Sequence, residues 1–198
     1  MGSGFLSNIF RFRACSPEIP LPKKADRSVA WQVDERLVSF ILVTEVDSGT
    51  FFTGELFQRK FGDSPPDFGH HIVAFYRDSE RKFLPASYLH LWTQGTLGLL
   101  GGVCTDGRVL QKMAPEQLSM LNQAGGLLRQ TLGYCFAKFE SQTEAFFIHC
   151  GDARAKEVAL QAGITETSDP YLLVRYNKVL TPKRQEELLC QAEAIGVF

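Results

Sequence analysis

The sequence predicts a single α/β domain in which helices cover a mixed sheet. Its 198 residues are 44% hydrophobic and 22% charged, an ordinary globular composition with enough length to bury a sizeable core. In the middle of the chain, apolar runs of strand length are joined by short polar turns, which is typical of an antiparallel meander. Further along, strands and helices alternate, and the two patterns together imply a mixed sheet covered by helices.

Four strands and one helix are expected in the first half of the chain. The strands are apolar or alternating runs that end at polar turns, at residues 36–46, 70–78, 83–95 and 96–105. The helix is expected at residues 49–62, because Phe52, Leu56, Phe57 and Phe61 recur at helical spacing. Gly62, followed by two prolines, is expected to end it.

The second half is expected to alternate helices and strands. Its helical segments are residues 114–139, 152–163 and 181–198, and its strands are residues 144–150 and 170–178. Gly125 and Gly126 lie inside the first helical segment, where each glycine would cost roughly 1 kcal/mol. They are therefore expected either to divide two helices or to mark a place where the backbone approaches a ligand.

Residues 1–35 are predicted to form an N-terminal arm and linker, and residues 36–198 the domain. The arm carries apolar residues between positions 5 and 12, and its prolines separate it from the body. It lacks the order of a secretory signal, and Leu6 stands where a myristoylation motif needs Ser or Thr. No apolar run reaches about 18 residues, so no membrane span is expected.

The net charge and the spacing of the cysteines indicate which partners and which cell compartment to expect. A net charge of −1 without a basic run argues against nucleic acid. The five cysteines are odd in number, far apart and without metal-ligand spacing, which argues against a disulfide framework and structural zinc. We therefore expect a reduced, cytoplasmic protein.

The stretch DARAKEVALQAGI (152–164) reads as a helix with an aspartate cap and a glycine exit. Together with the element order, it resembles the GNAT acyltransferase superfamily, in which an Asn opens a short helix of pattern N-x-x-A-x-x-x-Y-x-x-x-G-F. Asp152 stands in place of that Asn, Ala155 and Gly163 match, and Ile164 replaces Phe. Ala159 stands where many members carry a Tyr that protonates the departing thiolate.

The family's pyrophosphate-binding motif, Q/R-x-x-G-x-G/A, is not intact here. In one placement Val103 and Arg108 have the expected interval, but Gln111 and Met113 occupy the glycine positions. In the preferred placement Gly125 and Gly126 open the helix that binds the pyrophosphate through backbone N–H groups. Residues 107–124 are then an insertion that the family does not usually have.

The resemblance implies a GNAT-like fold with a V-shaped gap between residues 97–105 and 144–150. It implies transfer of an acyl group, such as acetyl, from acyl-coenzyme A to an amine of a small molecule or protein. Val103, Gly125, Gly126 and Asp152 are then the candidates for coenzyme contact. Gly101 and Gly102 would supply a bulge in the fourth strand.

Acylation of an amine needs a base, donors for the oxyanion and preferably an acid. His90, His149 and Asp106 are the candidate catalytic residues, because they lie on or after strands that would border the gap. Tyr88 and Tyr134 could replace the missing acid, although no spacing selects either. No metal-ligand pattern appears.

Several alternatives stay open at this stage. Asp152 could act only as a helix cap, and its charge would repel a phosphate. The glycine pair could serve tight packing, and each histidine could belong to the core. The alternative function is a non-catalytic GNAT-fold protein that senses acyl-coenzyme A or binds a partner through its apolar arm. A homodimer is a further expectation.

Overall fold

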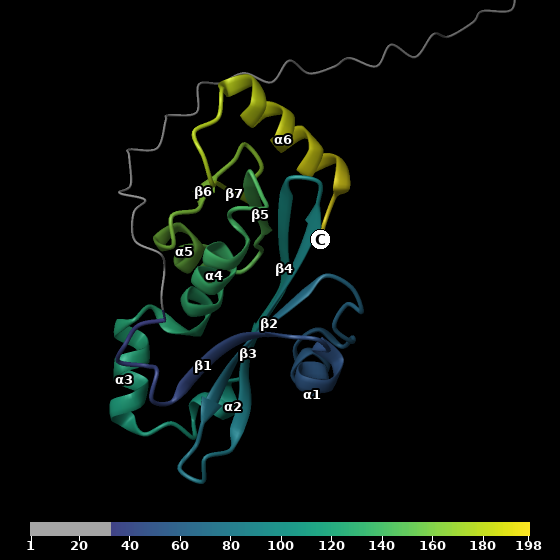
Figure 1. The fold of residues 1–198 in the computed structure, drawn as a ribbon. Coiled ribbons are helices and arrows are strands. Elements are labelled where there is room, and N and C mark those ends of the chain that lie inside the picture. Colours follow the sequence, from purple (N-terminus) through teal and green to yellow (C-terminus); the bar gives the residue numbers. More distant parts are fainter. Residues whose placement is uncertain (1–32) are drawn as a thin grey trace, which may run out of the picture. The chain divides into compact units, whose positions relative to one another are not determined.

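A computed structural model describes residues 33–198 of the chain. The arm predicted for residues 1–35 lies outside the described residues, except for its last three, and stays a prediction. One sheet of seven strands in the order β1-β2-β3-β4-β5-β7-β6 forms the centre of the described part (Figure 1). The predicted mixed α/β class is confirmed.

The first half follows the predicted elements closely. Its strands are β1 (Ile41–Val46), β2 (His70–Arg77), β3 (Phe83–Gln94) and β4 (Leu97–Thr105), and each pairs antiparallel with the next of these four. The helix α1 (Gly49–Phe61) begins at Ser48, whose side chain accepts a hydrogen bond from Phe51 N, and ends at the left-handed Gly62. The expected first strand at 36–46 is partly wrong, since residues 35–40 form turns and Leu37 turns into the core.

The second half contains the predicted elements and two that were not predicted. Its elements are α2 (Gly107–Leu110), α3 (Pro115–Gln123), α4 (Gly126–Phe139), β5 (Ala145–His149), α5 (Ala153–Gln161), β6 (Thr165–Glu166), β7 (Leu172–Tyr176) and α6 (Pro182–Ile195). The short α2 and β6 are the additions. Gly125 and Gly126 have φ of +86° and +79°, so they divide α3 from α4, as one of the two expectations stated.

Apolar residues pack on both faces of the sheet. On one face, which we call the α4 face, Ile72, Leu89 and Leu100 form a core with α3, α4 and α5. On the opposite face, the α1–α6 face, Val73 and Tyr88 pack under α1, while Leu99 and Phe147 pack under α6. Figure 1 shows α4 and α5 on one side of the sheet and α1 and α6 on the other.

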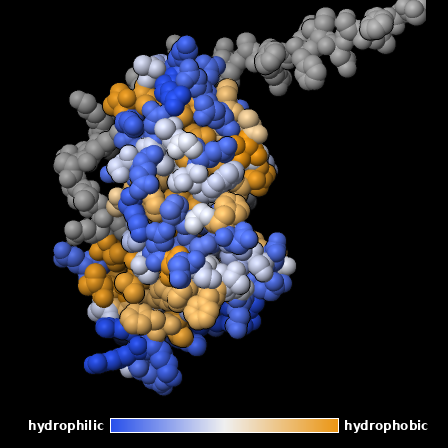
Figure 2. Space-filling view, turned by 45° about the vertical axis from the view of Figure 1, so that its right-hand side comes forward, coloured by the Kyte–Doolittle hydropathy of each residue, from blue (hydrophilic) through white to orange (hydrophobic). Residues whose placement is uncertain are grey.

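In residues 33–198, no helix is long and apolar enough to cross a membrane. Phenylalanine serves both the core and the surface. Phe136, Phe146 and Phe147 are fully buried, whereas Phe51 on α1 is 81% exposed. Figure 2 shows apolar side chains gathered in the lower part of the surface on the α1 side.

Candidate functional site

The sheet opens between β4 and β5. The two strands run parallel and pair over four residue pairs, from Leu97 with Ala145 to Leu100 with Ile148. β4 then continues to Thr105 without a β5 partner, while β5 ends at His149. Because the ladder stops within β4, the end of this strand has no β5 partner on that side, which agrees with the predicted V-shaped gap.

A bulge in β4 lies at the point where the gap opens. Tyr88 pairs with Cys104 and His90 pairs with Gly101, so two steps along β3 match three steps along β4. Gly102 takes a φ of +57°, which is the left-handed region that favours glycine. The bulge that the two glycines predict is therefore present.

Three histidines lie in one row across the α1–α6 face at the level of this bulge. His71 on β2 pairs with His90 on β3, which pairs with Gly101 on β4. His149 on β5 follows the last pair, Leu100 with Ile148. The sheet therefore brings the candidates His90 and His149 to opposite sides of Gly101, and it adds His71, which was not predicted.

The two buried histidines are held in neutral form. Burial lowers the pKa of His71 and of His90 below the usual value. His90 Nε2 lies 2.8 Å from the carbonyl oxygen of Phe68, which can only accept, so Nε2 carries the proton. The Nδ1 atom of His71 lies 2.9 Å from the Tyr88 hydroxyl, and burial raises the pKa of that tyrosine. Two neutral imidazoles thus stand 5.7 Å apart, centre to centre.

His149 differs from the other two histidines in its surroundings. Its Nδ1 atom is buried and has no hydrogen-bond partner among residues 33–198. Its ring lies 4.6 Å, centre to centre, from the ring of Phe198 in an edge-to-face arrangement. A buried imidazole nitrogen without a partner is rare, because the lost hydration is not replaced. His149 is therefore the histidine with the most evident capacity to receive a ligand's hydrogen bond.

The side chain of Asp106 makes contacts that hold two helices in place. Its side chain caps α2 by accepting from Arg108 N at 2.9 Å, and it pairs with Arg59 Nη2 of α1 at 2.5 Å. It lies beyond the end of β4, five residues past Gly101, and so outside the histidine row. Asp106 therefore links α1 to α2.

The coenzyme candidates lie at two helix starts and on β4. Asp152 caps α5, with its carboxylate accepting from Ala155 N at 2.8 Å, and its contact with a coenzyme stays a prediction. At the start of α4, by contrast, no side chain makes a capping hydrogen bond, and Gly125 takes the cap position. Val103 follows the bulge in β4 and packs against the core of the α4 face. Of the two helix starts, that of α4 is the one with backbone N–H groups free of a side-chain cap.

The direction of α4 places its uncapped start on the side where the sheet opens. Phe139, at its last turn, packs on His70 at the beginning of β2, with ring centres 4.5 Å apart. β2 runs in the same direction as β4, because both pair antiparallel to β3. The first turn of α4, about 20 Å away along the helix, therefore lies toward the ends of β4 and β5.

The element order and residues 152–164 predict a pair of neighbouring strands that separates part-way. The structure has this pair in β4 and β5, whose pairing ends at Leu100. The strand order and the parallel β4–β5 pair agree with the arrangement that the resemblance to the GNAT superfamily implies. No family model matches the sequence, and no curated protein matches it significantly. The insertion predicted at 107–124 holds α2 and α3.

Two solved structures resemble this chain in part. One is a candidate acetyltransferase from Exiguobacterium sp. 255-15, with 9% identity and a TM-score of 0.38, covering 69% of this chain and 93% of the other. The second is the KacTA–DNA complex, with 14% identity and a TM-score of 0.38, covering 76% of this chain and 99% of the other. The mixed α/β fold rests on the strand order and pairing of the described residues, and not on these likenesses.

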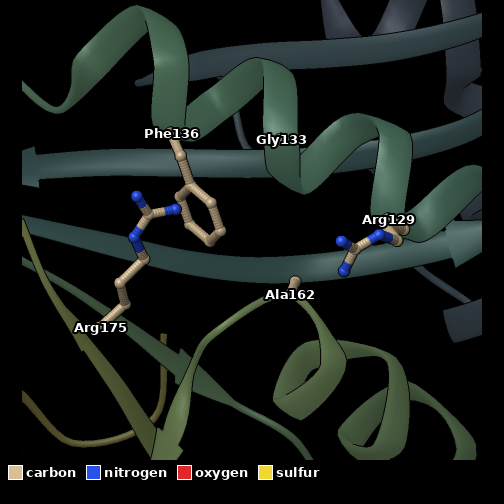
Figure 3. Close-up of a pocket in the computed structure, with 5 residues that line it drawn as sticks. All are labelled: Arg129, Gly133, Phe136, Ala162 and Arg175. Carbon is tan, nitrogen blue, oxygen red and sulfur yellow. The ribbon is translucent and has the colours of Figure 1, made fainter. Parts of the chain in front are cut away.

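A small hollow between α4 and α5 lies apart from the histidine row (Figure 3). Arg175 stacks on Phe136 with 4.2 Å from guanidinium carbon to ring centre, and Arg129 Nη1 donates to the Gln161 carbonyl at 2.6 Å. Gly133 and Ala162 complete the lining. None of the predicted site residues lines this hollow. In the described part of the chain, no three His, Cys, Asp or Glu side chains are placed to hold a metal ion.

Proposed function

We propose that the protein transfers an acyl group from acyl-coenzyme A to an amine. The observation that carries this proposal is the gap in which β4 continues past Leu100 without a β5 partner. The pantetheine arm of coenzyme A contains amide groups, which can pair with such a strand as a further β-strand would. In this proposal the thioester lies at the level of the bulge and the histidine row.

The uncapped start of α4 suits the pyrophosphate end of the coenzyme. Helix N-termini attract anions through free N–H groups and the helix dipole. A methyl group added at Gly126 would meet nothing within 4 Å, so the backbone is open to close approach there. Asp152 is the weaker candidate, because its carboxylate already occupies the first N–H groups of α5 and repels phosphate.

His149 is the best placed general base in this proposal. The amine nitrogen attacks the thioester carbonyl, and its proton passes to the unpartnered Nδ1 of His149 while the carbon–sulfur bond breaks. Backbone N–H groups at the β4 bulge are the proposed donors to the oxyanion. The departing thiolate takes its proton from water, since Ala159 is buried and offers no acid. His90 acts by lining the site in its neutral form.

Thermal unfolding with acetyl-coenzyme A tests the proposal. Ligand at 100 times its dissociation constant adds about 2.7 kcal/mol of stability. Asp152→Asn keeps a capping side chain and removes a negative charge, so it should tighten binding if phosphates lie beside α5 and leave affinity unchanged if they lie only at α4. Gly126→Asp should weaken binding, because it places a carboxylate where the pyrophosphate is proposed. No shift with acetyl- or longer acyl-coenzyme A would count against the proposal.

A second candidate is an acyl-coenzyme A sensor or interaction protein without catalysis. Ala159 favours it, because this buried position lacks the tyrosine acid of many GNAT enzymes. Coenzyme binding without product from a panel of amines, and without hydrolysis of the thioester, would favour this candidate. Conversion that is lost in His149→Gln while coenzyme binding persists would favour the enzyme.

A further inference from the structure

Phe198 covers the β4–β5 gap on the α1–α6 face. Its ring lies 4.6 Å from that of His149, at the end of β5. Its main chain lies against Gly101 on β4, where an added methyl group would stand 2.4 Å from the Phe198 carbonyl oxygen. One residue therefore contacts both strands at the level where their pairing stops. Figure 1 shows the chain end beside β4, after it has left α6.

The contacts of this segment change sharply from one residue to the next. Gly196 takes a φ of +83° after the last turn of α6, which redirects the chain toward the sheet. Val197 is 87% exposed, whereas Phe198 packs against the cluster formed by Leu99, Phe147 and their neighbours. Trp92 borders the same cluster. The sequence thus directs an aromatic ring, and not its neighbour, to the open side of the gap.

The site beneath Phe198 has features that a core position does not need. Gly101 offers bare backbone, and a side chain there would exclude the occupant. His149 keeps a buried Nδ1 atom without a partner among the described residues, beside the ring. A core built only for packing would not leave a polar atom unsatisfied, because that costs stability. These groups suit a ligand that brings both an aromatic ring and a hydrogen-bonding group.

We propose that the space held by Phe198 is a displaceable subsite for an amine that carries an aromatic ring. The ring would replace that of Phe198 beside His149, and the amine would reach His149 Nδ1. This inference rests on the proposed function for its chemistry, since it names the class of acceptor. Phe198 then competes with the amine for the subsite. The apparent affinity for the amine equals the intrinsic affinity multiplied by the fraction of molecules in which Phe198 has left the subsite.

A binding experiment without coenzyme tests the subsite. The probe is 2-phenylethylamine, titrated into the full chain while the His149 ring signals are followed by NMR. The matched variants are Phe198→Ala, which opens the subsite, and Val197→Ala, which changes the exposed neighbour. Butylamine, which has a similar charge and no ring, controls for charge alone.

We expect Phe198→Ala to bind 2-phenylethylamine at least ten times more tightly than the wild type or Val197→Ala, with shifts of the His149 signals. Butylamine should show no such gain. Equal dissociation constants for the two variants, or equal gains for both amines, would overturn the proposal. If Phe198→Ala does not fold, Phe198→Val removes the ring and part of the side-chain volume, and unchanged probe affinity in that variant would equally overturn the proposal.

The coenzyme experiment separates this inference from the proposed function. Failure of acetyl-coenzyme A to bind any variant would remove the acyl transfer and leave an aromatic amine site established by the titration. Coenzyme binding together with an unchanged titration would remove the subsite and leave the acyltransferase proposal standing.

Discussion

At the scale of single residues, Gly98 shows how tightly the paired part of β4 is packed. An added Cβ would lie 2.4 Å and 2.7 Å from ring atoms of Phe146, which is fully buried. That ring cannot move away easily, since Phe136 packs on it with ring centres 5.0 Å apart. The close approach of β4 and β5 therefore depends on the absence of a side chain at this position.

Gly98→Ala should lower the free energy of unfolding by about 1–3 kcal/mol, because it overpacks a rigid core. Urea unfolding measures the change. Gly107→Ala is the matched control, since a methyl group there meets nothing within 4 Å, and it should stay within about 0.5 kcal/mol of wild type. Equal stability of the two variants would show that the Phe146 ring moves aside.

At the scale of elements, an ion-paired cluster holds α4 to the edge of the sheet. Glu45 on β1 accepts from Lys138 Nζ of α4 at 2.5 Å and contacts His70 Nδ1 of β2 at 2.7 Å. The Tyr134 hydroxyl accepts from the backbone N–H of Glu45 at 3.2 Å. Burial alone would raise the pKa of Glu45, but the hydrogen bonds from Lys138 and His70 outweigh it and lower that pKa.

Because the pKa of Glu45 is lowered in the folded state, its contribution to stability is present above its ordinary pKa of 4.5 and lost as the pH falls through the folded value. Glu45→Gln should therefore be less stable than wild type at neutral pH, and the difference should shrink in acid below pH 4.5. Urea unfolding across this range measures both. A difference that is independent of pH would mean that the carboxylate charge does not hold α4.

At the scale of the whole molecule, the buried histidines link stability to pH. His71 and His90 both have lowered pKa values because burial disfavours their charged forms. The unfolded chain binds protons at these positions from about pH 6.5 downward, whereas the folded protein resists them. Unfolding free energy should therefore fall as the pH drops below 6.5. The loss should be complete once the pH is below the folded pKa values.

Replacing both histidines by glutamine, which keeps polar side chains without this titration, should flatten the pH profile of stability just below pH 6.5. Denaturant unfolding at closely spaced pH values is the measurement. The acid loss that Glu45 causes lies in a lower range, so the two effects can be told apart. An unchanged profile in the double variant would assign the loss to other groups.

Helix caps and turns depend on neighbouring residues, so the sequence predicts them well. The features that it did not predict depend on contacts between residues far apart in the chain. Asp152 and Thr181 cap the helices they precede, because a cap depends on a few neighbouring residues. The glycine bulge in β4 follows in the same way from Gly101 and Gly102. His71 was missed because strand register, and not spacing, brings it beside His90. The contact of Phe198 with Gly101 joins residues far apart in sequence, which no local pattern reports.

The short β4–β5 ladder also has a mechanical consequence. Four residue pairs join the meander of β1–β4 to the smaller group of β5, β7 and β6. We expect any relative movement of these two groups of strands to occur at this short seam, because few backbone hydrogen bonds join them there. α4 and α6 pack across the seam on opposite faces. At its paired end, Arg184 of α6 donates hydrogen bonds to both Glu144 and Thr96. Such movement would widen one end of the molecule and leave the other fixed.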